Sequence, residues 1–429
     1  MTPRLLCAVF VVILAVLVEQ AVAAADAVPP PVDLNSQIFR YLDSADAEEA
    51  ASALQAMLSN PMITIDRAVR IIQTERVYSP QPTGTLPEER IDVQGRASRL
   101  ALSIPPTYQP AKEYGLVVCL HGAGFTGEAY LERWEARLGG EFIVACPTAP
   151  MGAWFTRGAE ELVLATIHSV QRRYHIDPDR IFLTGMSNGG IGAWVIGMHQ
   201  APLFAGLAPM ASGLDNVLMP FLANLRSTPI YIIHGVKDEV MPVELSRAIT
   251  QELTRLGYSF VYREHDREHP MAGGHYFPKE ELPELVNWFH TQRRNPLPRT
   301  VTVVREASHL QPFGWVRIDA TDPIAAFSED LISKRDDLIK RREYARLDAS
   351  IVAPNRIEVQ AVRVQRYSLF LNEQLIDSSK PVVVLTNGQV SFEGLVTPSI
   401  ETLLRQARLR QDSQQLFPIH LAVQVRKQP

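Results

Sequence analysis

The chain contains little cysteine. Its 429 residues include three, of which Cys7 lies in an apolar N-terminal segment, and Cys119 and Cys146 lie in apolar runs predicted as neighbouring parallel strands. Cysteines in such strands are usually buried as small hydrophobic side chains, so we expect no disulfide between them. Stability must come from a core, and a content of 46% hydrophobic residues is enough for two or three domains.

A strong excess of one charge is also absent. The formal net charge is −5, and the lysines and arginines are scattered along the chain. The densest basic run, residues 334–342, is interleaved with acidic residues and is typical of a solvated helix face. We therefore expect no nucleic-acid partner.

No hydrophobic run is long enough to span a bilayer. The apolar run at residues 5–18 is shorter than the ~18–20 residues that a transmembrane helix needs. It follows Arg4 and precedes the small residues 21–25, which is the order of a secretory signal and its cleavage site. We predict a signal peptide at residues 1–23 and an exported mature protein, secreted or periplasmic, without a membrane anchor.

Three regions are expected after the signal. Residues 24–88 form a helical N-terminal region with a linker at 80–87, residues 89–294 an α/β catalytic domain, and residues 295–429 a strand-rich accessory domain. In the catalytic domain strand-like runs alternate with helical patterns, which predicts a mostly parallel sheet covered on both faces. Its predicted strands are residues 99–104, 116–120, 142–146, 181–184, 203–210, 230–233 and 260–263, with a turn at 177–179.

The accessory domain carries no obvious chemistry. Its predicted strands are residues 301–304, 315–318, 356–360, 367–371, 381–386 and 421–425, and its predicted helices are 328–346 and 399–410. His309 and His420 are isolated in this pattern, and we expect them to be solvated or packed.

The most informative motif is Gly185-Met186-Ser187-Asn188-Gly189-Gly190, between a predicted strand and a predicted helix. G-x-S-x-G in that context is a nucleophile elbow, in which a tight turn exposes the serine at the top of a parallel sheet. We predict Ser187 as the nucleophile. Its oxyanion hole is assigned to the N–H groups of Asn188 and of Ala123, in the turn 121–124, with Gly124 as the alternative upstream donor.

The chain order serine, acid, histidine predicts the other two catalytic residues. Asp238 lies just beyond the strand 230–233, where catalytic groups gather in α/β sheets, and Asp215 is the alternative acid. His275 is the predicted base. It lies in a glycine loop that follows the last predicted strand of the catalytic domain, 260–263. The other histidines that follow Asp238 are His265, His269 and His290.

Two further features have alternative interpretations. The segment 264–269 contains two histidines among carboxylates, but it leaves a strand rather than sharing a helix face. A solvated charged turn is therefore favoured over a metal site. Trp154 and Phe155 either line the substrate pocket or belong to the core.

These motifs together resemble the α/β-hydrolase esterases related to poly(3-hydroxybutyrate) depolymerases and feruloyl esterases. The resemblance covers about residues 90–294 and rests on the segments 103–108, 121–124, 176–190 and 273–275. It implies an α/β-hydrolase fold and an exported carboxylic-ester hydrolase without cofactor or metal, acting on small-molecule or polymer esters. The implied triad is Ser187, Asp238 and His275.

Two other functions share these motifs. A serine peptidase of the prolyl-oligopeptidase kind has the same elbow and the same triad order, although such enzymes usually carry a large propeller before the hydrolase domain. An inactive binding protein built on this fold would be expected to have lost a triad residue, and none is lost in this sequence.

Overall fold

The computed structural model describes residues 33–138, 140–327 and 337–426. It divides the chain into two compact units, Met1–Ile63 and Thr64–Pro429. The predicted signal peptide and residues 328–336 of the predicted helix 328–346 lie outside the described residues. Among the described helices, none combines the length and the apolar character that a membrane span requires.

In its described residues, 33–63, the first unit contains two helices, α2 (Leu34–Asp43) and α3 (Ala47–Leu58). Aspartates begin both helices: Asp33 accepts a hydrogen bond from Ser36, and Asp46 accepts from Glu48 and Glu49. Side-chain capping of this kind satisfies N–H groups that have no partner within the helix. The expected helical character of this region is confirmed.

The second unit begins with α4 (Ile65–Thr74) and the edge strand β1 (Gly84–Val93). Strand β1 was not predicted, because Pro80, Pro82, Gly84 and Pro87 indicated a linker at 80–87. It pairs antiparallel with β2 (Arg96–Ile104), and the register shifts between Leu86 and Glu89, on either side of Pro87. An edge strand tolerates proline at such a bulge. The boundary expected between residues 88 and 89 therefore lies inside a strand.

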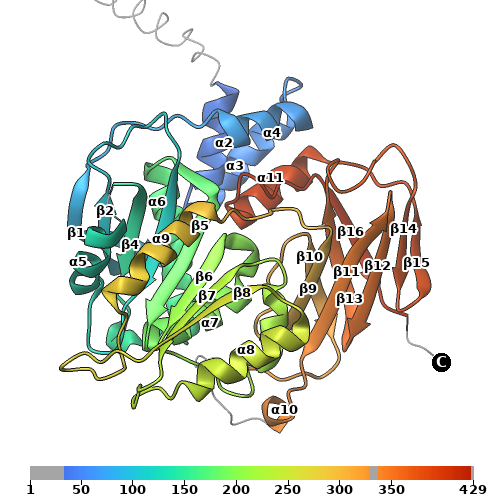
Figure 1. Cartoon of the computed structure of the whole chain (residues 1–429). Coiled ribbons are helices and arrows are strands. Elements are labelled where there is room, and N and C mark those ends of the chain that lie inside the picture. The colour runs from blue at the N-terminus through green and yellow to red at the C-terminus, as the bar shows by residue number, and fades with distance from the viewer. Residues whose placement is uncertain (1–32, 139, 328–336, 427–429) are drawn as a thin grey trace, which may run out of the picture. The chain divides into compact units, whose positions relative to one another are not determined.

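The second unit is built around an eight-stranded sheet of order β1-β2-β4-β3-β5-β6-β7-β8 (Figure 1). Strands β1, β2 and β4 pair antiparallel, and all later pairs are parallel. This confirms the expected mostly parallel sheet of an α/β hydrolase. The remaining strands are β3 (Tyr114–Leu120), β4 (Phe142–Pro147), β5 (Ile176–Met186), β6 (Gly206–Met210), β7 (Ile230–Gly235) and β8 (Phe260–His265).

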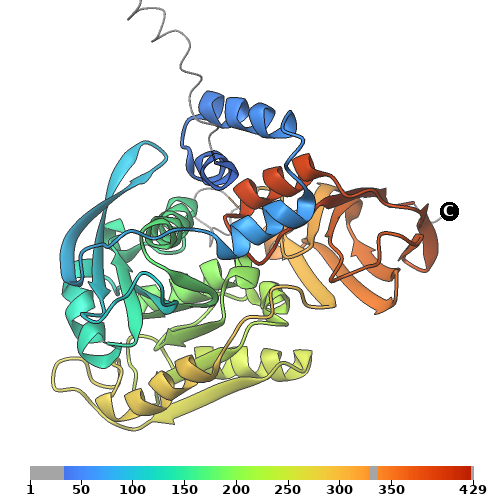
Figure 2. The same ribbon diagram turned by 90° about the horizontal axis from the view of Figure 1, so that it is seen from above.

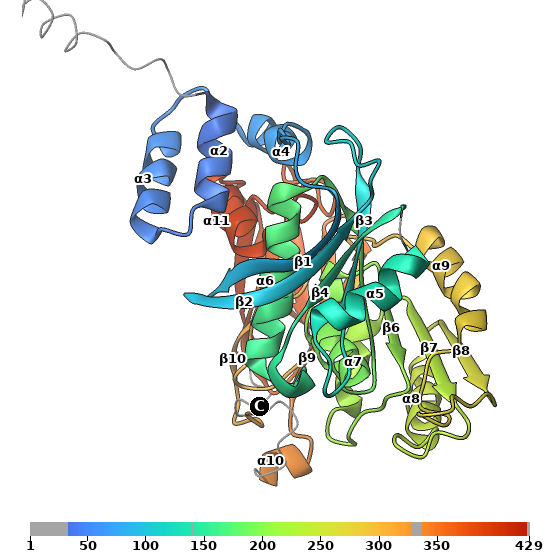
Figure 3. The same ribbon diagram turned by 90° about the vertical axis from the view of Figure 1, so that its left-hand side faces the viewer.

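Helices cover both faces of the sheet (Figure 3). On one face α5 (Gly127–Leu138) and α9 (Leu282–Thr291) bury aromatic residues such as Trp134 and Phe289. On the other face lie α6 (Arg157–Arg173), α7 (Asn188–His199) and α8 (Glu244–Leu256). Because both faces are covered, strands β3 and β4 are buried along their whole length. Cys119 and Cys146 lie in these two strands, buried and free.

Two local predictions in this domain are wrong. The expected turn at Asp177-Pro178-Asp179 lies within β5, where the pairing with β3 jumps from Ile176 to Ile181. Because proline has no N–H for the ladder, the segment forms a bulge rather than a turn. The strand expected at 203–210 starts only at Gly206, because Leu203 is the last residue of a 3-10 turn, Ala201–Leu203.

The accessory region contains two sheets, as its strand-rich sequence predicted (Figure 2). The five-stranded sheet has the order β15 (Gln389–Gly394), β14 (Val382–Thr386), β12 (Arg356–Val362), β11 (Ala345–Ala353), β9 (Thr300–Arg305). The three-stranded sheet has the order β10 (Val316–Thr321), β13 (Val364–Leu371), β16 (Ile419–Gln424). Helix α11 (Ile400–Arg410) confirms one predicted helix.

The other predicted helix, 328–346, is wrong in its described part. Only α10 (Asp337–Lys340) is helical, and β11 already begins at Ala345. Strand β11 alternates buried and partly buried residues, which is the period of a half-buried strand and not of a helix. The turn expected at Asn387-Gly388 is confirmed between β14 and β15, with φ of 51° and 81°.

The accessory sheets pack on the layer of helices and loops that covers one face of the hydrolase sheet. The side chain of Asn224 donates to the carbonyl of Val304 and accepts from its N–H at 2.6 Å. Arg305 donates to the carbonyl of His199, and the hydroxyl of Tyr344 donates to the carbonyl of Val217. These bonds join β9 and its neighbours to the helical layer that also carries α7.

Candidate active site

The nucleophile elbow has the strained backbone that its sequence predicts. Ser187 lies between the end of β5 and the start of α7, with φ 59° and ψ −124°. A Cβ at Gly185 would lie 2.4 Å from the carbonyl oxygen of Gly189, and a Cβ at Gly189 would lie 2.0 Å from that of Leu120. Only glycine fits at either position. An L-residue with positive φ between such glycines is the conformation expected of an exposed nucleophile.

The predicted acid and the predicted base are hydrogen-bonded to each other. Asp238 follows β7, and its buried Oδ2 lies 2.7 Å from Nδ1 of His275. Its other oxygen, Oδ1, accepts from the N–H groups of Val240 and Met241 at 2.9 and 2.8 Å. The proton of the His275 ring therefore sits on Nδ1, and Nε2 is left as a base.

Two glycines allow the histidine loop to pack on the acid loop. A Cβ at Gly274 would lie 2.6 Å from the backbone nitrogen of Asp238. A Cβ at Gly235, the last residue of β7, would lie 2.2 Å from the carbonyl oxygen of Gly274. Gly274 and Gly235 therefore have a packing role: they let the backbone of the His275 loop approach the loop of Asp238 closely.

The turn that follows β3 lies beside the nucleophile. A Cβ at Gly122 would lie 3.7 Å from Cβ of Ser187. The turn is held by His121, whose Nδ1 donates to the Gly122 carbonyl at 2.9 Å and whose Nε2 accepts from Ala149 at 3.2 Å. Burial lowers the pKa of His121, which keeps the ring neutral as these two bonds require. The roles of Ala123 and Asn188 as oxyanion donors stay predictions.

Trp154 belongs to the core and does not line the pocket. Its side chain is fully buried, and its indole N–H donates to the carbonyl of His121 at 2.7 Å. Phe155 is partly buried and packs against the same core. Through this hydrogen bond Trp154 supports the turn beside Ser187.

The alternative acid and the alternative bases make hydrogen bonds or ion pairs with residues outside the predicted triad. Asp215 accepts from the N–H of Val217 within its own turn. Nε2 of His265 donates to the carbonyl of Tyr276, Nδ1 of His269 accepts from Met271, and His290 pairs with Glu141. Of the four histidines considered as the base, only His275 is bonded to Asp238. Its catalytic role stays a prediction.

Glu264 and His265 end strand β8, and residues 266–269 begin the charged, ion-paired turn that follows it. Glu264 receives two bonds from Arg247, which lower the pKa of its carboxyl to about 2. Glu268 pairs with Lys237, and Arg267 pairs with Glu280. The favoured interpretation of a solvated turn agrees with these contacts.

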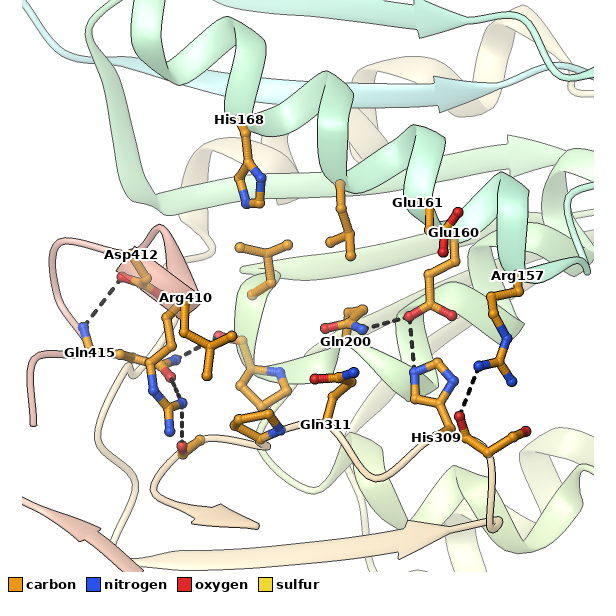
Figure 4. Close-up of a pocket in the computed structure, with 17 residues that line it drawn as sticks. Arg157, Glu160, Glu161, His168, Gln200, His309, Gln311, Arg410, Asp412 and Gln415 are labelled. Atoms are coloured by element: carbon orange, nitrogen blue, oxygen red, sulfur yellow. Dashed lines mark hydrogen bonds and ion pairs between the residues drawn. The ribbon is translucent and has the colours of Figure 1, made fainter. Parts of the chain in front are cut away.

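A buried polar cluster that the sequence did not predict lies in a pocket between α6 and the segment after β9 (Figure 4). The carboxylate of Glu160 lies 3.3 Å from Nδ1 of His199 and 3.1 Å from Nε2 of His309, and it accepts from Gln200. His309 is thus packed, one of the two states expected for it. The pocket has a volume of about 260 Å³.

This cluster is held together by hydrogen bonds and ion pairs to Glu160. The ligand atoms that Glu160, His199 and His309 offer lie within 4.8 Å of one another, and the two rings are tilted by 30° with centroids 4.1 Å apart. Burial lowers the pKa of His199 to about 4, and the charge of His309 adds to this effect. Burial acts to raise the pKa of Glu160, but His309 and His199 outweigh it and hold that pKa well below its usual range.

Comparisons with known proteins identify the enzyme class. No family profile matches the chain. A probable feruloyl esterase C from Aspergillus terreus is 28% identical over 203 residues, covering 44% of this chain and 72% of the relative. Acyl-protein thioesterase 1 from Gibberella zeae is 26% identical, covering 44% and 96%. Poly(3-hydroxyalkanoate) depolymerase C from Paucimonas lemoignei is 32% identical, covering 25% and 30%.

A solved structure of a thermostable esterase is 27% identical and covers 49% of this chain and 63% of its own, with a TM-score of 0.42. The relatives named above are carboxylester hydrolases, and they confirm the resemblance to esterases of the feruloyl esterase and polyhydroxyalkanoate depolymerase kind. The chain is thus an enzyme of the carboxylic-ester hydrolase class. Each of the four proteins named here aligns with less than half of this chain, so the detailed activity of this protein is a proposal.

Proposed function

We propose that this protein is an exported serine carboxylic-ester hydrolase in which Ser187, His275 and Asp238 form the catalytic triad. The observation that carries the proposal is the 2.7 Å bond between Asp238 and His275. It fixes the base in the tautomer that a serine hydrolase needs. The positive φ of Ser187 at the end of β5 supports the same assignment of the nucleophile.

The mechanism follows from these groups. Nε2 of His275 takes the proton of the Ser187 hydroxyl as Oγ attacks the ester carbonyl, and Asp238 stabilises the imidazolium that forms. The N–H groups of Ala123 and Asn188 donate to the oxyanion, each contributing about 3–4 kcal/mol to the transition state. His275 then returns the proton to the leaving alcohol. Water hydrolyses the acyl-enzyme with the same base, and neither cofactor nor metal is needed.

Substitution of the nucleophile tests the reaction. Ser187→Ala should abolish hydrolysis of a short p-nitrophenyl ester and labelling by a fluorophosphonate, while the circular dichroism spectrum stays that of the wild type. Near-normal activity of this variant would remove Ser187 from the mechanism. A panel of peptide p-nitroanilides run beside the esters separates an esterase from a serine peptidase, because only the peptidase must cleave the amides.

The substrate is expected to be an ester of a small molecule or of a polymer. The screen uses acetylated, feruloylated and polyhydroxyalkanoate esters, the last two suggested by the names of the relatives, with the Ser187→Ala protein as the blank. Export rests on the predicted signal peptide. N-terminal sequencing of protein recovered outside the cytoplasm should begin at Ala24.

A further inference from the structure

A second histidine lies beside the acid and takes no part in the proposed mechanism. His234 is in β7, four residues before Asp238, and its side chain is fully buried. Its Nε2 lies 2.7 Å from the carbonyl oxygen of Met241 and 3.3 Å from Oδ2 of Asp238. Its Nδ1 lies 2.7 Å from the hydroxyl oxygen of Ser246, a buried residue of α8.

These partners determine where the ring carries its proton. Nε2 faces two acceptors, a carbonyl and a carboxylate oxygen, so it must bear the hydrogen. Burial lowers the pKa of His234 and outweighs the bonds to Met241 and Asp238 that act to raise it, so the ring is neutral near pH 7. A neutral ring has a single N–H, and Nδ1 therefore accepts a hydrogen bond from Ser246.

The hydroxyl of Ser246 completes this arrangement. It lies 2.7 Å from Nδ1 of His234 and 3.1 Å from the carbonyl oxygen of Ser212, and its one proton can serve only one of them at a time. With the ring hydrogen on Nε2, the proton of Ser246 goes to the shorter contact, at Nδ1. Helix α8 thus supplies the partner of the second ring nitrogen.

The same ring closes the turn that carries Asp238. Met241 donates its N–H to Oδ1 of Asp238 and accepts the Nε2–H of His234 on its carbonyl. The turn is therefore held both by its own carboxylate and by the neighbouring strand. With Oδ1 taken by backbone N–H groups, Oδ2 is the oxygen that faces both His275 and His234.

We propose that His234 is a positioning residue for the acid: its Nε2–H, shared between Met241 and Asp238, keeps Oδ2 directed at His275. The inference rests on the proposed function, since it concerns the acid of that triad. His234 acts here as a hydrogen-bond donor and not as a charge. The charged and titratable groups near it are Asp238, His275 and Glu264, and Glu264 is paired with Arg247.

Two amide substitutions distinguish the role of the Nε2–H donor from the packing role of the His234 ring. In His234→Gln the amide nitrogen can occupy the place of Nε2, whereas in His234→Asn the shorter side chain places it near Nδ1. We expect His234→Gln to keep kcat within about 3-fold of the wild type. His234→Asn should lower kcat by about 10- to 100-fold with little change in KM, because a small displacement of a catalytic group costs rate rather than binding.

Substitution of Ser246 gives an independent arm with a matched control. Ser246→Ala removes the donor to Nδ1 and leaves that buried nitrogen without its partner. It should lower kcat less than His234→Asn does, because Nε2 still faces its two acceptors. Thr250→Ala is the control. It removes another hydroxyl from α8, but that hydroxyl donates to the carbonyl of Arg247 within the helix, so kcat should not change. Nitrogen-15 NMR of the wild type should show the hydrogen of His234 on Nε2.

The measurement is kcat and KM on a soluble p-nitrophenyl ester from pH 5 to 9, with unfolding midpoints for each variant. Supporting results are a Gln variant that tracks the wild type across this range and an Asn variant that does not. The inference is overturned if both variants keep wild-type kcat. It is also overturned if both lose it equally, since a packing or charge role would then suffice. A wild-type protein without ester hydrolysis or fluorophosphonate labelling would instead refute the proposed function, and the inference with it.

Discussion

Nδ1 of His275 lies 2.7 Å from Oδ2 of Asp238, although 37 residues separate the two along the chain. The carboxylate is fully buried, and its other oxygen is held by two backbone N–H groups. Its orientation is therefore fixed before any substrate binds. A buried, fixed acceptor on Nδ1 is what holds Nε2 ready to accept a proton.

Replacing this acid by its amide should stop catalysis without unfolding the protein. In Asp238→Asn the amide oxygen can still accept from Val240 and Met241, but the amide N–H₂ faces Nδ1 of His275 and favours the wrong tautomer. We expect kcat on a soluble ester to fall by about 10⁴-fold. Asp215→Asn, in the alternative acid, should leave kcat unchanged. Equal losses in the two variants would refute the assignment of Asp238.

The oxyanion turn can be tested from a residue that contacts it. Gly152 has φ 68°, and a Cβ there would lie 3.3 Å from the backbone nitrogen of Ala123 and 3.2 Å from the carbonyl oxygen of Gly122. Gly152→Ala should displace the Ala123 N–H and lower kcat by about 10²-fold, with KM little changed. Gly158→Ala is the control, because a Cβ at Gly158 meets nothing within 4 Å. Unchanged kcat in Gly152→Ala would argue against Ala123 as a donor.

The parts of this site that the sequence predicts are those encoded locally. The elbow needs glycines at fixed offsets from Ser187, because neighbouring backbone would clash with any Cβ, and that requirement is visible in six residues. Asp238 and His275 follow from chain order and from their place after β7 and β8. The elements that carry them were found for the same reason: buried parallel strands are short, continuous apolar runs.

Long-range contacts leave no such local pattern. Glu160, His199 and His309 meet only because the accessory sheet packs on the α6 side of the hydrolase sheet, and no spacing in the sequence links them. The contact of His234 with Ser246 depends in the same way on how α8 packs. Strand β11 was missed because a charged run precedes it, and β1 because Pro87 lies in an edge-strand bulge.

Arg294 should be a major determinant of stability. It lies at the expected domain boundary, is 2% exposed, and bonds Asp179 of the hydrolase sheet and Asp412 beyond α11. Arg294→Ala leaves two carboxylates without their partner and should cost about 3–5 kcal/mol in the free energy of unfolding, measured with urea. Its neighbour Arg293 is 57% exposed, and Arg293→Ala should cost about 0–1 kcal/mol. Similar losses in both variants would contradict a special role for Arg294.

Acid should destabilise the protein through His199. Burial, with the charge of His309, lowers the pKa of this ring to about 4, against about 6.5 in an unfolded chain. Between these values the unfolded chain binds a proton that the folded protein does not, so the free energy of unfolding falls as the pH falls from 6.5 to 4. At about 1.4 kcal/mol per pKa unit, the difference of about 2.5 between the two pKa values corresponds to a loss on the order of 3 kcal/mol from this group.

Urea unfolding at several pH values gives the slope of the free energy of unfolding against pH. This slope separates the contribution of His199 titration from any pH-independent effect of a substitution. His199→Asn keeps an amide that can donate to Glu160 from the place of Nδ1 but cannot titrate, so the stability of this variant should fall less steeply between pH 6.5 and 4. Some slope should remain, because burial also lowers the pKa of His168 to about 4. His290→Gln, at an exposed position of α9, should keep the wild-type slope. A His199→Asn protein as acid-sensitive as the wild type would show that a group other than His199 takes up the proton.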